Sequence, residues 1–277
     1  MKKLSFFFSS LLSWSVVLAA QSVKYEVLHE ADGVIWGFDF LSESEIIFTL
    51  RSGELKKLNW KTGKVNPVSG VPAVRTRGQG GLLDVRVHPK NPRQIFLTYA
   101  KPVGRSEATT ALATAVLQES DQTSLQLKEL KDIFVAGAPS DESLHFGSRV
   151  EFSGDYLFMS IGDRGDREKA QSLTHHQGKI IRLFLNGNVP QDNPFVGKSG
   201  ALPEIWSYGH RNPQGLAVRK KDGELWSAEF GPRGGDEINR LGRGLNYGWP
   251  EVTHGREYYG PKIGVKSKAG TEAPAHY

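Results

Sequence analysis

Residues Ser207–Pro250 have the sequence SYGHRNPQGLAVRKKDGELWSAEFGPRGGDEINRLGRGLNYGWP. Two short apolar segments in this stretch, QGLAVR and LWSAEFG, are separated by the polar turn KKDG, and a third, DEINRL, follows a loop rich in glycine and proline. Short apolar segments with turn residues between them and no helical periodicity predict antiparallel β-strands. Polar side chains that could form a binding site lie at the ends of these predicted strands.

The same three-part pattern occurs three times upstream. The first segments are VIWGFDF, LLDVRVH, SRVEF and QGLAVR, beginning at residues 34, 82, 148 and 214. The second, strongly apolar segments are IIFTL, IFLTY, YLFMSIG and LWSAEFG, beginning at residues 46, 95, 156 and 225, and the third are ELKKL, ATAVL, KIIRLFL and DEINRL. A further strand is predicted from Val23 to Glu30. Repeated β-modules of this kind predict an all-β fold and favour a β-propeller, with two packed sandwiches as the alternative.

Residues 1–20 differ from the rest of the chain. Lys2 and Lys3 precede an apolar run from Leu4 to Ala20 that ends in small residues. This pattern is typical of a secretory signal peptide, with a retained N-terminal anchor as the alternative. We therefore expect a signal peptide over 1–20, a β-propeller domain over 21–277, a periplasmic or secreted location, and no membrane span after cleavage.

Composition excludes several function classes. Removing Lys2 and Lys3 from the 35 basic residues leaves 33 against 30 acidic ones, which is too balanced to indicate a nucleic-acid partner. The chain has no cysteine, so disulfides, thiolate metal sites and thiol nucleophiles are excluded.

Three polar clusters directly precede the first strands of the second, third and fourth modules. They contain Gln79, His145, and the pair Arg211 and Asn212. In a propeller the first strand of each blade lines the central channel, so we expect these clusters to meet at one rim of it. A neutral imidazole can take a proton from a substrate hydroxyl, and Arg beside Asn suits a planar, oxygen-rich anion. The alternatives are a tight turn at Gln79, a structural His145, and an Arg211 that braces the channel wall.

The loop from Gly231 to Glu237 has exposed carbonyls and carboxylates, which are oxygen ligands that Ca²⁺ accepts. A hairpin loop with solvated acidic residues is the alternative. The segment from Ile161 resembles it, with Asp163 and Asp166 as turn residues or weaker cation ligands. His175 and His176 are predicted to lie at the surface.

Several motifs together resemble the glucose/sorbosone dehydrogenase family, and within it the soluble aldose sugar dehydrogenases that use pyrroloquinoline quinone (PQQ). They are GQGGLLDV, SLHFGSRVEF, GKIIRLFLNGNVPQDNPF, YGHRNPQGLAV, EFGPRGGDEINRL and LNYGWP. The resemblance runs from about Val34 to the C-terminus. It implies a six-bladed β-propeller that oxidises the C1 hydroxyl of an aldose to a lactone by hydride transfer to PQQ, and then passes electrons to a periplasmic acceptor.

The resemblance also implies roles for individual residues. His145 corresponds to the general base, and Arg211 to the group that stabilises negative charge on the quinone. The implied PQQ contacts are Gln79, Arg211, Asn212 and Tyr258. The implied ligands of the Ca²⁺ that polarises PQQ are Gly231 and Pro232, and those of a second, structural Ca²⁺ are Glu237 and Tyr247.

The chain departs from the family in length. Four modules are present, and at ~40–50 residues per blade roughly two blades of the family fold are missing. We therefore expect a propeller truncated to about four blades, as a fragment of a longer reading frame. Two other functions stay open: a Ca²⁺-dependent propeller lactonase or other hydrolase, and an inactive propeller used for binding.

Overall fold

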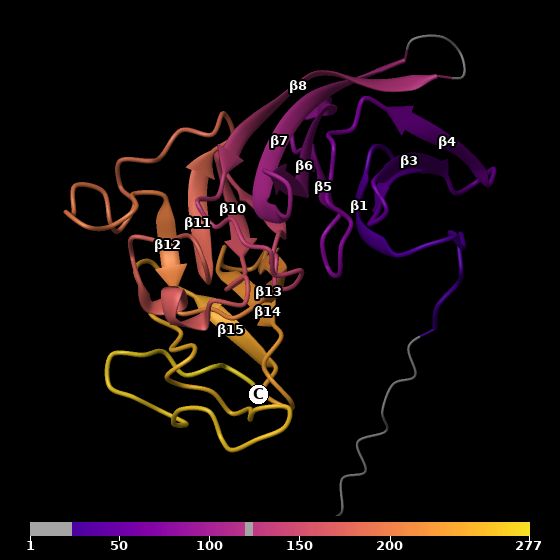
Figure 1. The fold of residues 1–277 in the computed structure, drawn as a ribbon. Helices are drawn as coiled ribbons and strands as arrows, with labels where there is room; N and C mark the ends of the chain where they lie inside the picture. Colours follow the sequence, from indigo (N-terminus) through magenta and orange to yellow (C-terminus); the bar gives the residue numbers. More distant parts are fainter. Residues whose placement is uncertain (1–23, 120–123) are drawn as a thin grey trace, which may run out of the picture.

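The structure is a computed structural model that describes residues 24–119 and 124–277. Within those residues the chain is all-β, with fifteen strands and one short 3-10 helix, η1 (Arg167–Gln171) (Figure 1). The predicted signal peptide lies outside the described residues. The predicted strand at the N-terminus is wrong, because residues 24–30 form no ladder. They pack on the first sheet through side chains instead, as in the ring contact between His29 and Phe48.

The first two blades are four-stranded antiparallel meanders. Their strands are β1 (Ile35–Phe40), β2 (Glu45–Leu50), β3 (Glu54–Asn59) and β4 (Lys64–Ser69), then β5 (Leu82–His88), β6 (Asn91–Val103), β7 (Glu107–Glu119) and β8 (Leu125–Val135). A short parallel pairing of β4 with β8, at Val68 with Leu125, joins the two blades into one eight-stranded sheet.

The third and fourth blades follow in chain order. Their strands are β9 (Val150–Ser153), β10 (Tyr156–Ile161), β11 (Lys179–Phe184) and β12 (Ile205–Tyr208), then β13 (Pro213–Val218), β14 (Leu225–Glu229) and β15 (Glu237–Leu241). All twelve strands predicted from the repeated modules are present, so the module pattern is confirmed. The outer edge of β15 is partly covered by the C-terminal segment, where the Ile238 N–H donates to the His276 carbonyl at 2.8 Å.

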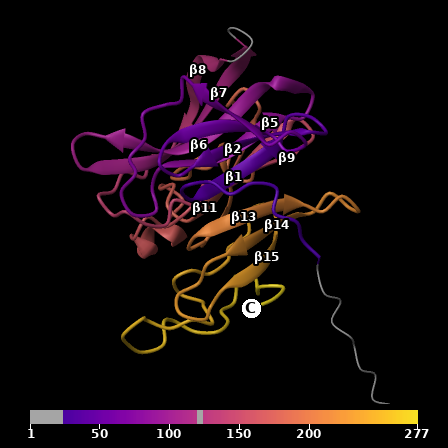
Figure 2. The same cartoon turned by 90° about the vertical axis from the view of Figure 1, so that its right-hand side faces the viewer.

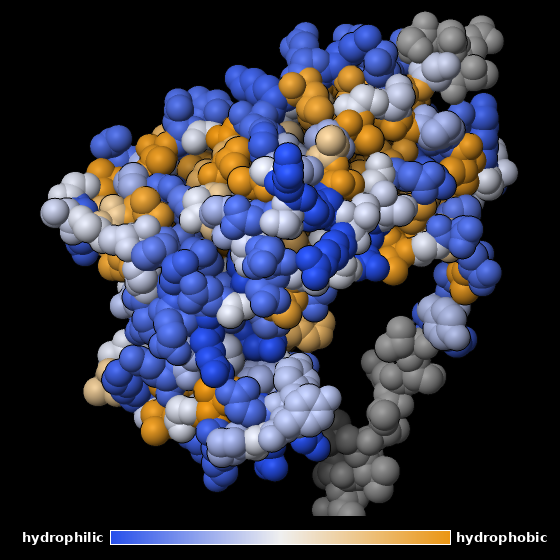
Figure 3. Space-filling view, in the orientation of Figure 1, coloured by the Kyte–Doolittle hydropathy of each residue, from blue (hydrophilic) through white to orange (hydrophobic). Residues whose placement is uncertain are grey.

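The blades pack face to face, and the hydrophobic core lies in layers between them. One layer joins blades 1 and 2 around Ile47 and Leu97, the next joins blades 2 and 3 around Phe96 and Met159, and the third joins blades 3 and 4 around Ile180. Figure 2 shows the fourth blade, in orange, beside the earlier blades in indigo and magenta. On the face seen in Figure 3, apolar residues reach the surface mainly over the earlier blades.

Hydroxyl side chains connect successive blades at their inner strands. Thr49 on β2 accepts a hydrogen bond from Gly37 in its own blade and donates to the Leu83 carbonyl in the next. Thr98 on β6 does the same one blade later, accepting from Asp84 at 2.8 Å and donating to the Ser148 carbonyl at 2.7 Å. We call these contacts the Thr49 and Thr98 links, and they fix the register between neighbouring first strands.

Carboxylates on the first strands form a second set of inter-blade contacts. Asp39 on β1 accepts from the Val87 N–H and pairs with Arg86, both on β5. Asp84 on β5 makes the equivalent contacts one blade further on, with the Val150 N–H at 2.9 Å and Arg149 at 2.7 Å. Burial raises the pKa of Asp84, and the charge of Arg149 opposes that rise. The first strands are therefore tied together around a common axis, which sets the positions of the residues at their entry points.

Candidate active site

A cavity of about 390 Å³ opens where the first strands begin. It is lined by Val34, Trp36, Arg51, Gln79, His145, Arg211, Asn212, Gln214, Phe230, Gly231 and Tyr258. The structure thus brings together residues from all four blades, including the predicted polar clusters. Their functional roles stay predictions, but their common location follows from the packing of the blades.

His145 is held against Asp163. The Nδ1 atom of His145 lies 2.7 Å from Oδ1 of Asp163, whose side chain is only 2% exposed. An ionised carboxylate can only accept, so Nδ1 carries the hydrogen and the lone pair is on Nε2. The sequence predicted Asp163 to be a turn residue or a weaker cation ligand. It is a turn residue, since its carboxylate accepts from the Gly165 N–H at 2.9 Å and its carbonyl from the Asp166 N–H at 2.9 Å, and it is also the partner that fixes the histidine tautomer.

The loop that carries His145 has an unusual backbone. His145 has a φ of +52°, a region that side-chain-bearing residues adopt only when their surroundings enforce it. Gly162 makes this conformation possible, because a Cβ there would lie 2.1 Å from the His145 carbonyl oxygen. Close packing of two loops therefore aims the imidazole at the cavity.

Gln79 and Asn212 support the same loop. The side-chain oxygen of Gln79 accepts from the His145 N–H at 2.7 Å, and that of Asn212 accepts from the Gly147 N–H at 3.1 Å. Within the described part of the chain, neither side-chain amide nitrogen has a protein acceptor at hydrogen-bond distance. Both residues line the cavity, so both amide nitrogens are available to a ligand there.

Arg211 is fixed at its backbone and at its guanidinium. Its carbonyl accepts from the Asp163 N–H at 2.8 Å, and its N–H donates to the Glu229 carboxylate. β13 begins at Pro213, so Arg211 lies outside the ladder, and the Glu229 side chain supplies the acceptor for its N–H. The guanidinium donates from Nη1 to the carbonyls of Phe230 at 2.9 Å and Gly231 at 3.1 Å.

A buried triad lies behind Arg211. His210 contacts Glu229 through Nδ1 at 2.9 Å and Ser207 through Nε2 at 2.9 Å. Ser207 and His210 are both fully buried, so no substrate reaches this serine. The triad therefore serves to orient Glu229, and through it the Arg211 backbone.

Arg164 is a supporting residue that the sequence did not reveal. It is fully buried, and its guanidinium donates to the carbonyls of Leu144 and Glu142 on the loop preceding His145. It also lies over the Phe146 ring, 3.5 Å from the centroid. Burial lowers the pKa of Arg164 to about 10, which leaves it charged at neutral pH. This arginine anchors the loop that presents the histidine.

The Gly-Pro turn lies at the edge of the cavity. The Gly231 N–H donates to Asp236 at 3.0 Å, which closes the turn. A Cβ at Gly255 would lie 2.1 Å from the Pro232 carbonyl oxygen, so only glycine allows that approach. A cation bound by the Gly231 carbonyl would share that oxygen with Arg211.

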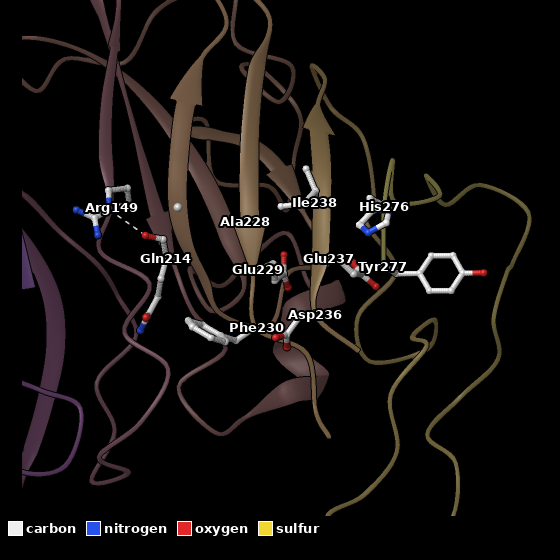
Figure 4. A pocket seen from close by; sticks show the side chains of 11 residues that line it. Arg149, Gln214, Ala228, Glu229, Phe230, Asp236, Glu237, Ile238, His276 and Tyr277 are labelled. Carbon is white, nitrogen blue, oxygen red and sulfur yellow. Dashed lines mark hydrogen bonds between the residues drawn. The ribbon is translucent and has the colours of Figure 1, made fainter. Parts of the chain in front are cut away.

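A second cavity, of about 640 Å³, lies on the other side of Gln214 and Phe230 (Figure 4). Glu229 and Glu237 face each other across β14 and β15 in this region. Burial raises the pKa of Glu237 to about 7, and the charge of Glu229 adds to that rise. Two carboxylates this close favour a proton or a cation between them.

Tyr247, the second predicted ligand of the structural cation, has its hydroxyl occupied. This hydroxyl donates to the Arg240 carbonyl at 2.6 Å and accepts from the Gly242 N–H at 2.9 Å. Burial raises its pKa to about 12. Only the main-chain carbonyl of Tyr247 therefore suits a cation. Among the described residues no group of three or more His, Cys, Asp and Glu is arranged to hold a metal.

Tyr258 and His176 are the remaining positions with a sequence prediction, and the structure places one at the cavity and buries the other. Tyr258 is half-exposed, and its carbonyl accepts from Arg233 at 2.8 Å, which holds it at the cavity. The prediction that His176 lies at the surface is wrong. Its Nδ1 accepts from the Gly137 N–H at 2.7 Å and its Nε2 contacts Glu204 at 2.6 Å, because the loop turns inward beneath the end of β8.

The fold and cavity define an all-β propeller enzyme with a polar site at one rim of its blades. The chain matches the Glucose / Sorbosone dehydrogenase family over residues 33–277 and belongs to that family. It is an oxidoreductase, as are the dehydrogenases it resembles.

Two curated relatives illustrate the resemblance. The chain is 42% identical over 288 aligned positions to the aldose sugar dehydrogenase YliI of Escherichia coli (strain K12), covering 100% of this chain and 76% of that protein. It is 31% identical over 251 positions to quinoprotein glucose dehydrogenase B of Acinetobacter calcoaceticus, covering 81% of this chain and 51% of that protein.

Solved structures of aldose sugar dehydrogenases have the same fold as this chain. The soluble aldose sugar dehydrogenase of Escherichia coli in the apo-form superimposes with a TM-score of 0.84 at 40% identity, over 90% of this chain and 73% of that one. The PQQ-bound aldose sugar dehydrogenase of Streptomyces coelicolor superimposes with a TM-score of 0.76 at 28% identity, over 90% of this chain and 69% of that one. In the described ranges, no helix is long and apolar enough to cross a membrane.

Proposed function

We propose that this protein oxidises the C1 hydroxyl of aldose sugars to lactones, with PQQ as the hydride acceptor and Ca²⁺ bound beside it. The observation that carries the proposal is the His145–Asp163 pair at 2.7 Å in a cavity that also contains the Arg211 guanidinium. A base and a cationic hydrogen-bond donor in one cavity suit removal of a proton and stabilisation of negative charge.

The residues around the cavity fit the cofactor. PQQ is planar, with carboxylates and quinone oxygens on its rim. Arg51, Arg211 and the amides of Gln79 and Asn212 supply donors for such oxygens, while Trp36 supplies a flat apolar surface. The name of the Streptomyces coelicolor structure states that it holds PQQ, which supports the same assignment here.

Different residues of the chain would remove the proton and stabilise the charges that form. Nε2 of His145 takes the proton of the C1 hydroxyl, because Asp163 holds the hydrogen on Nδ1. Asp163 stabilises the imidazolium that results. Arg211 places a fixed positive charge in the same cavity as His145, where it favours the reduced form of a bound acceptor. When bound, the quinone supplies the hydride acceptor.

Ca²⁺ has two proposed places. The carbonyls of Gly231 and Pro232 are oxygen ligands at the cavity edge, next to Arg211. Glu237 and the Tyr247 carbonyl are proposed for a second ion, which would relieve the repulsion between Glu237 and Glu229. We further propose a periplasmic location and a periplasmic electron acceptor, on the basis of the N-terminal sequence pattern.

The test is reconstitution of the purified protein with PQQ and Ca²⁺, followed by titration with aldoses and an artificial dye. We expect a change in the PQQ absorption spectrum on binding and sugar-dependent dye reduction. His145→Ala should lower kcat by ~100-fold or more while PQQ affinity changes little, and His175→Ala, outside the cavity, is the matched control.

Other outcomes would replace the proposal. Hydrolysis of lactones with Ca²⁺ and no PQQ binding would indicate the hydrolase. Sugar binding without dye reduction by any aldose would indicate a binding propeller.

A further inference from the structure

Trp249 contacts both Asp163, the partner of the proposed base, and Arg211, the proposed cationic donor. It lies in the loop after β15 and is 6% exposed. Its indole Nε1 donates to Oδ2 of Asp163 at 2.8 Å. Its ring also faces the Arg211 guanidinium, with 5.4 Å from Cζ to the ring centroid. One side chain thus contacts both the carboxylate bonded to His145 and the arginine that lines the same cavity.

The backbone of Trp249 is fixed on both sides. Its N–H donates to the Gly209 carbonyl at 2.9 Å, and its carbonyl accepts from Nε2 of Gln171 at 2.8 Å. Gln171 is in turn held by Asn246 through two reciprocal hydrogen bonds of 3.0 and 2.8 Å. The indole therefore belongs to a rigid frame that includes η1 and the segment before Arg211.

The indole bond decides how Asp163 is oriented. Oδ1 of Asp163 receives two contacts, from His145 at 2.7 Å and from the Gly165 N–H at 2.9 Å. Oδ2 receives the indole N–H, and it has no other protein donor within the described ranges. A carboxylate bonded at Oδ1 alone can turn about its last torsion, which is a soft one. Without the indole N–H, the plane of Asp163 and the bond to His145 lose their fixed direction.

Charge alone cannot replace this bond. Arg164 and Arg167 act on Asp163 through electrostatic attraction, and neither makes a hydrogen bond to it. Such attraction depends little on how the carboxylate is turned, whereas the indole N–H favours one orientation only.

We infer that Trp249 is a positioning residue, which fixes the orientation of Asp163 and hence the tautomer and direction of His145, and whose ring keeps Arg211 in place. This inference rests on the proposed function for its catalytic consequence. The geometry of the Asp163 contact is independent of the reaction.

The experiment compares Trp249→Phe with Trp206→Phe. Both tryptophans lie against an arginine, since Trp206 faces Arg182 at 4.9 Å. The Nε1 atom of Trp206 is buried and has no hydrogen-bond partner, so its replacement by Phe removes a ring edge and no hydrogen bond. The pair therefore separates loss of packing from loss of the indole donor.

Two readouts are needed. In the cofactor-free protein, ¹⁵N NMR of His145 should show a single Nδ1–H tautomer in the wild type and in Trp206→Phe, and a mixture of tautomers in Trp249→Phe. In the PQQ-loaded protein, Trp249→Phe should lower kcat about tenfold, the value of one charge-assisted hydrogen bond, with the KM for the sugar within about threefold.

A single tautomer and an unchanged kcat in Trp249→Phe would overturn the inference, as would equal effects of the two substitutions on His145. If the wild type oxidises no aldose, the proposed function fails, and the NMR comparison still decides the role of Trp249.

Discussion

Replacing Asp163 by Asn tests the centre of the site most directly. The change keeps the shape of the side chain and removes its charge and one acceptor. Asp163 receives hydrogen bonds at both oxygens: from His145 and the Gly165 N–H at Oδ1, and from Trp249 at Oδ2. An asparagine has one acceptor oxygen, so in either orientation its NH₂ group faces an N–H donor.

The cost can be worked from these contacts. With the oxygen toward Trp249, the NH₂ group faces the Gly165 N–H and donates to Nδ1 of His145, which moves the imidazole hydrogen to Nε2. One charge-assisted hydrogen bond is lost and one buried donor is unsatisfied, so the free energy of unfolding should fall by about 2–4 kcal/mol. The Nε2 lone pair is lost as well, so kcat should fall by ~10²–10⁴-fold.

Urea denaturation gives the first quantity, and dye reduction by the PQQ-loaded protein gives the second. Asp166→Asn is the control, because Asp166 lies in the same loop and makes only a partly exposed ion pair with Lys169. That change should cost less than about 0.5 kcal/mol. An Asp163→Asn protein as stable and as active as the wild type would refute the tautomer argument.

Three further predictions concern buried charges. Arg164→Met should lower the free energy of unfolding by about 3 kcal/mol in urea titrations, because it leaves the carbonyls that anchor the His145 loop without donors; a loss below about 1 kcal/mol would contradict this anchoring role. Glu237→Gln should stabilise the Ca²⁺-free protein at pH 8 by about 1–2 kcal/mol, since the raised pKa of Glu237, about 7, means that ionisation destabilises the fold as pH rises from 4.5 through 7. The same variant should lose its thermal response to Ca²⁺, and an unchanged response would place the cation elsewhere. Burial lowers the pKa of Lys179 to about 7, so the cost of its charge is complete below pH 7 and disappears toward pH 10.5. Wild-type stability measured against Lys179→Met should therefore rise between pH 7 and 10 by up to about 1.4 kcal/mol per pH unit, and a flat difference would show that the three carbonyls around Nζ offset the burial.

The blades were predictable from the sequence because each strand and turn is encoded locally. Alternating apolar segments and turn residues located the first three strands of every blade, but not the fourth strands β4, β8 and β12. Residues 24–30 have a similar pattern, yet they form no strand, because a ladder also needs a partner edge that local sequence does not reveal.

The site was predictable only in part, for a related reason. His145 and Arg211 lie beside the strand starts, so the repeat located them. The role of Asp163 depends on its hydrogen bond from Trp249, which is 86 residues away in the sequence. Local sequence patterns do not predict a contact over such a separation. The prediction that His176 lies at the surface failed for the same reason, since its polar partner Glu204 comes from a turn that is distant in the sequence.

The Thr49 and Thr98 links have a direction along the chain. Each of these two hydroxyls accepts within its own blade and donates to the next one, so the first and second blades each hold the start of the blade that follows. Ser160, at the corresponding place in the third blade, accepts from the Arg149 N–H at 3.0 Å. Ala228 occupies the corresponding place in the fourth blade, paired with Gly215 as Thr49 is with Gly37, and it has no hydroxyl to donate. The threonine hydroxyls therefore join the first three blades, and the fourth blade is held by contacts of another kind, such as the bond from Nε of Arg149 to the Gln214 carbonyl at 2.9 Å.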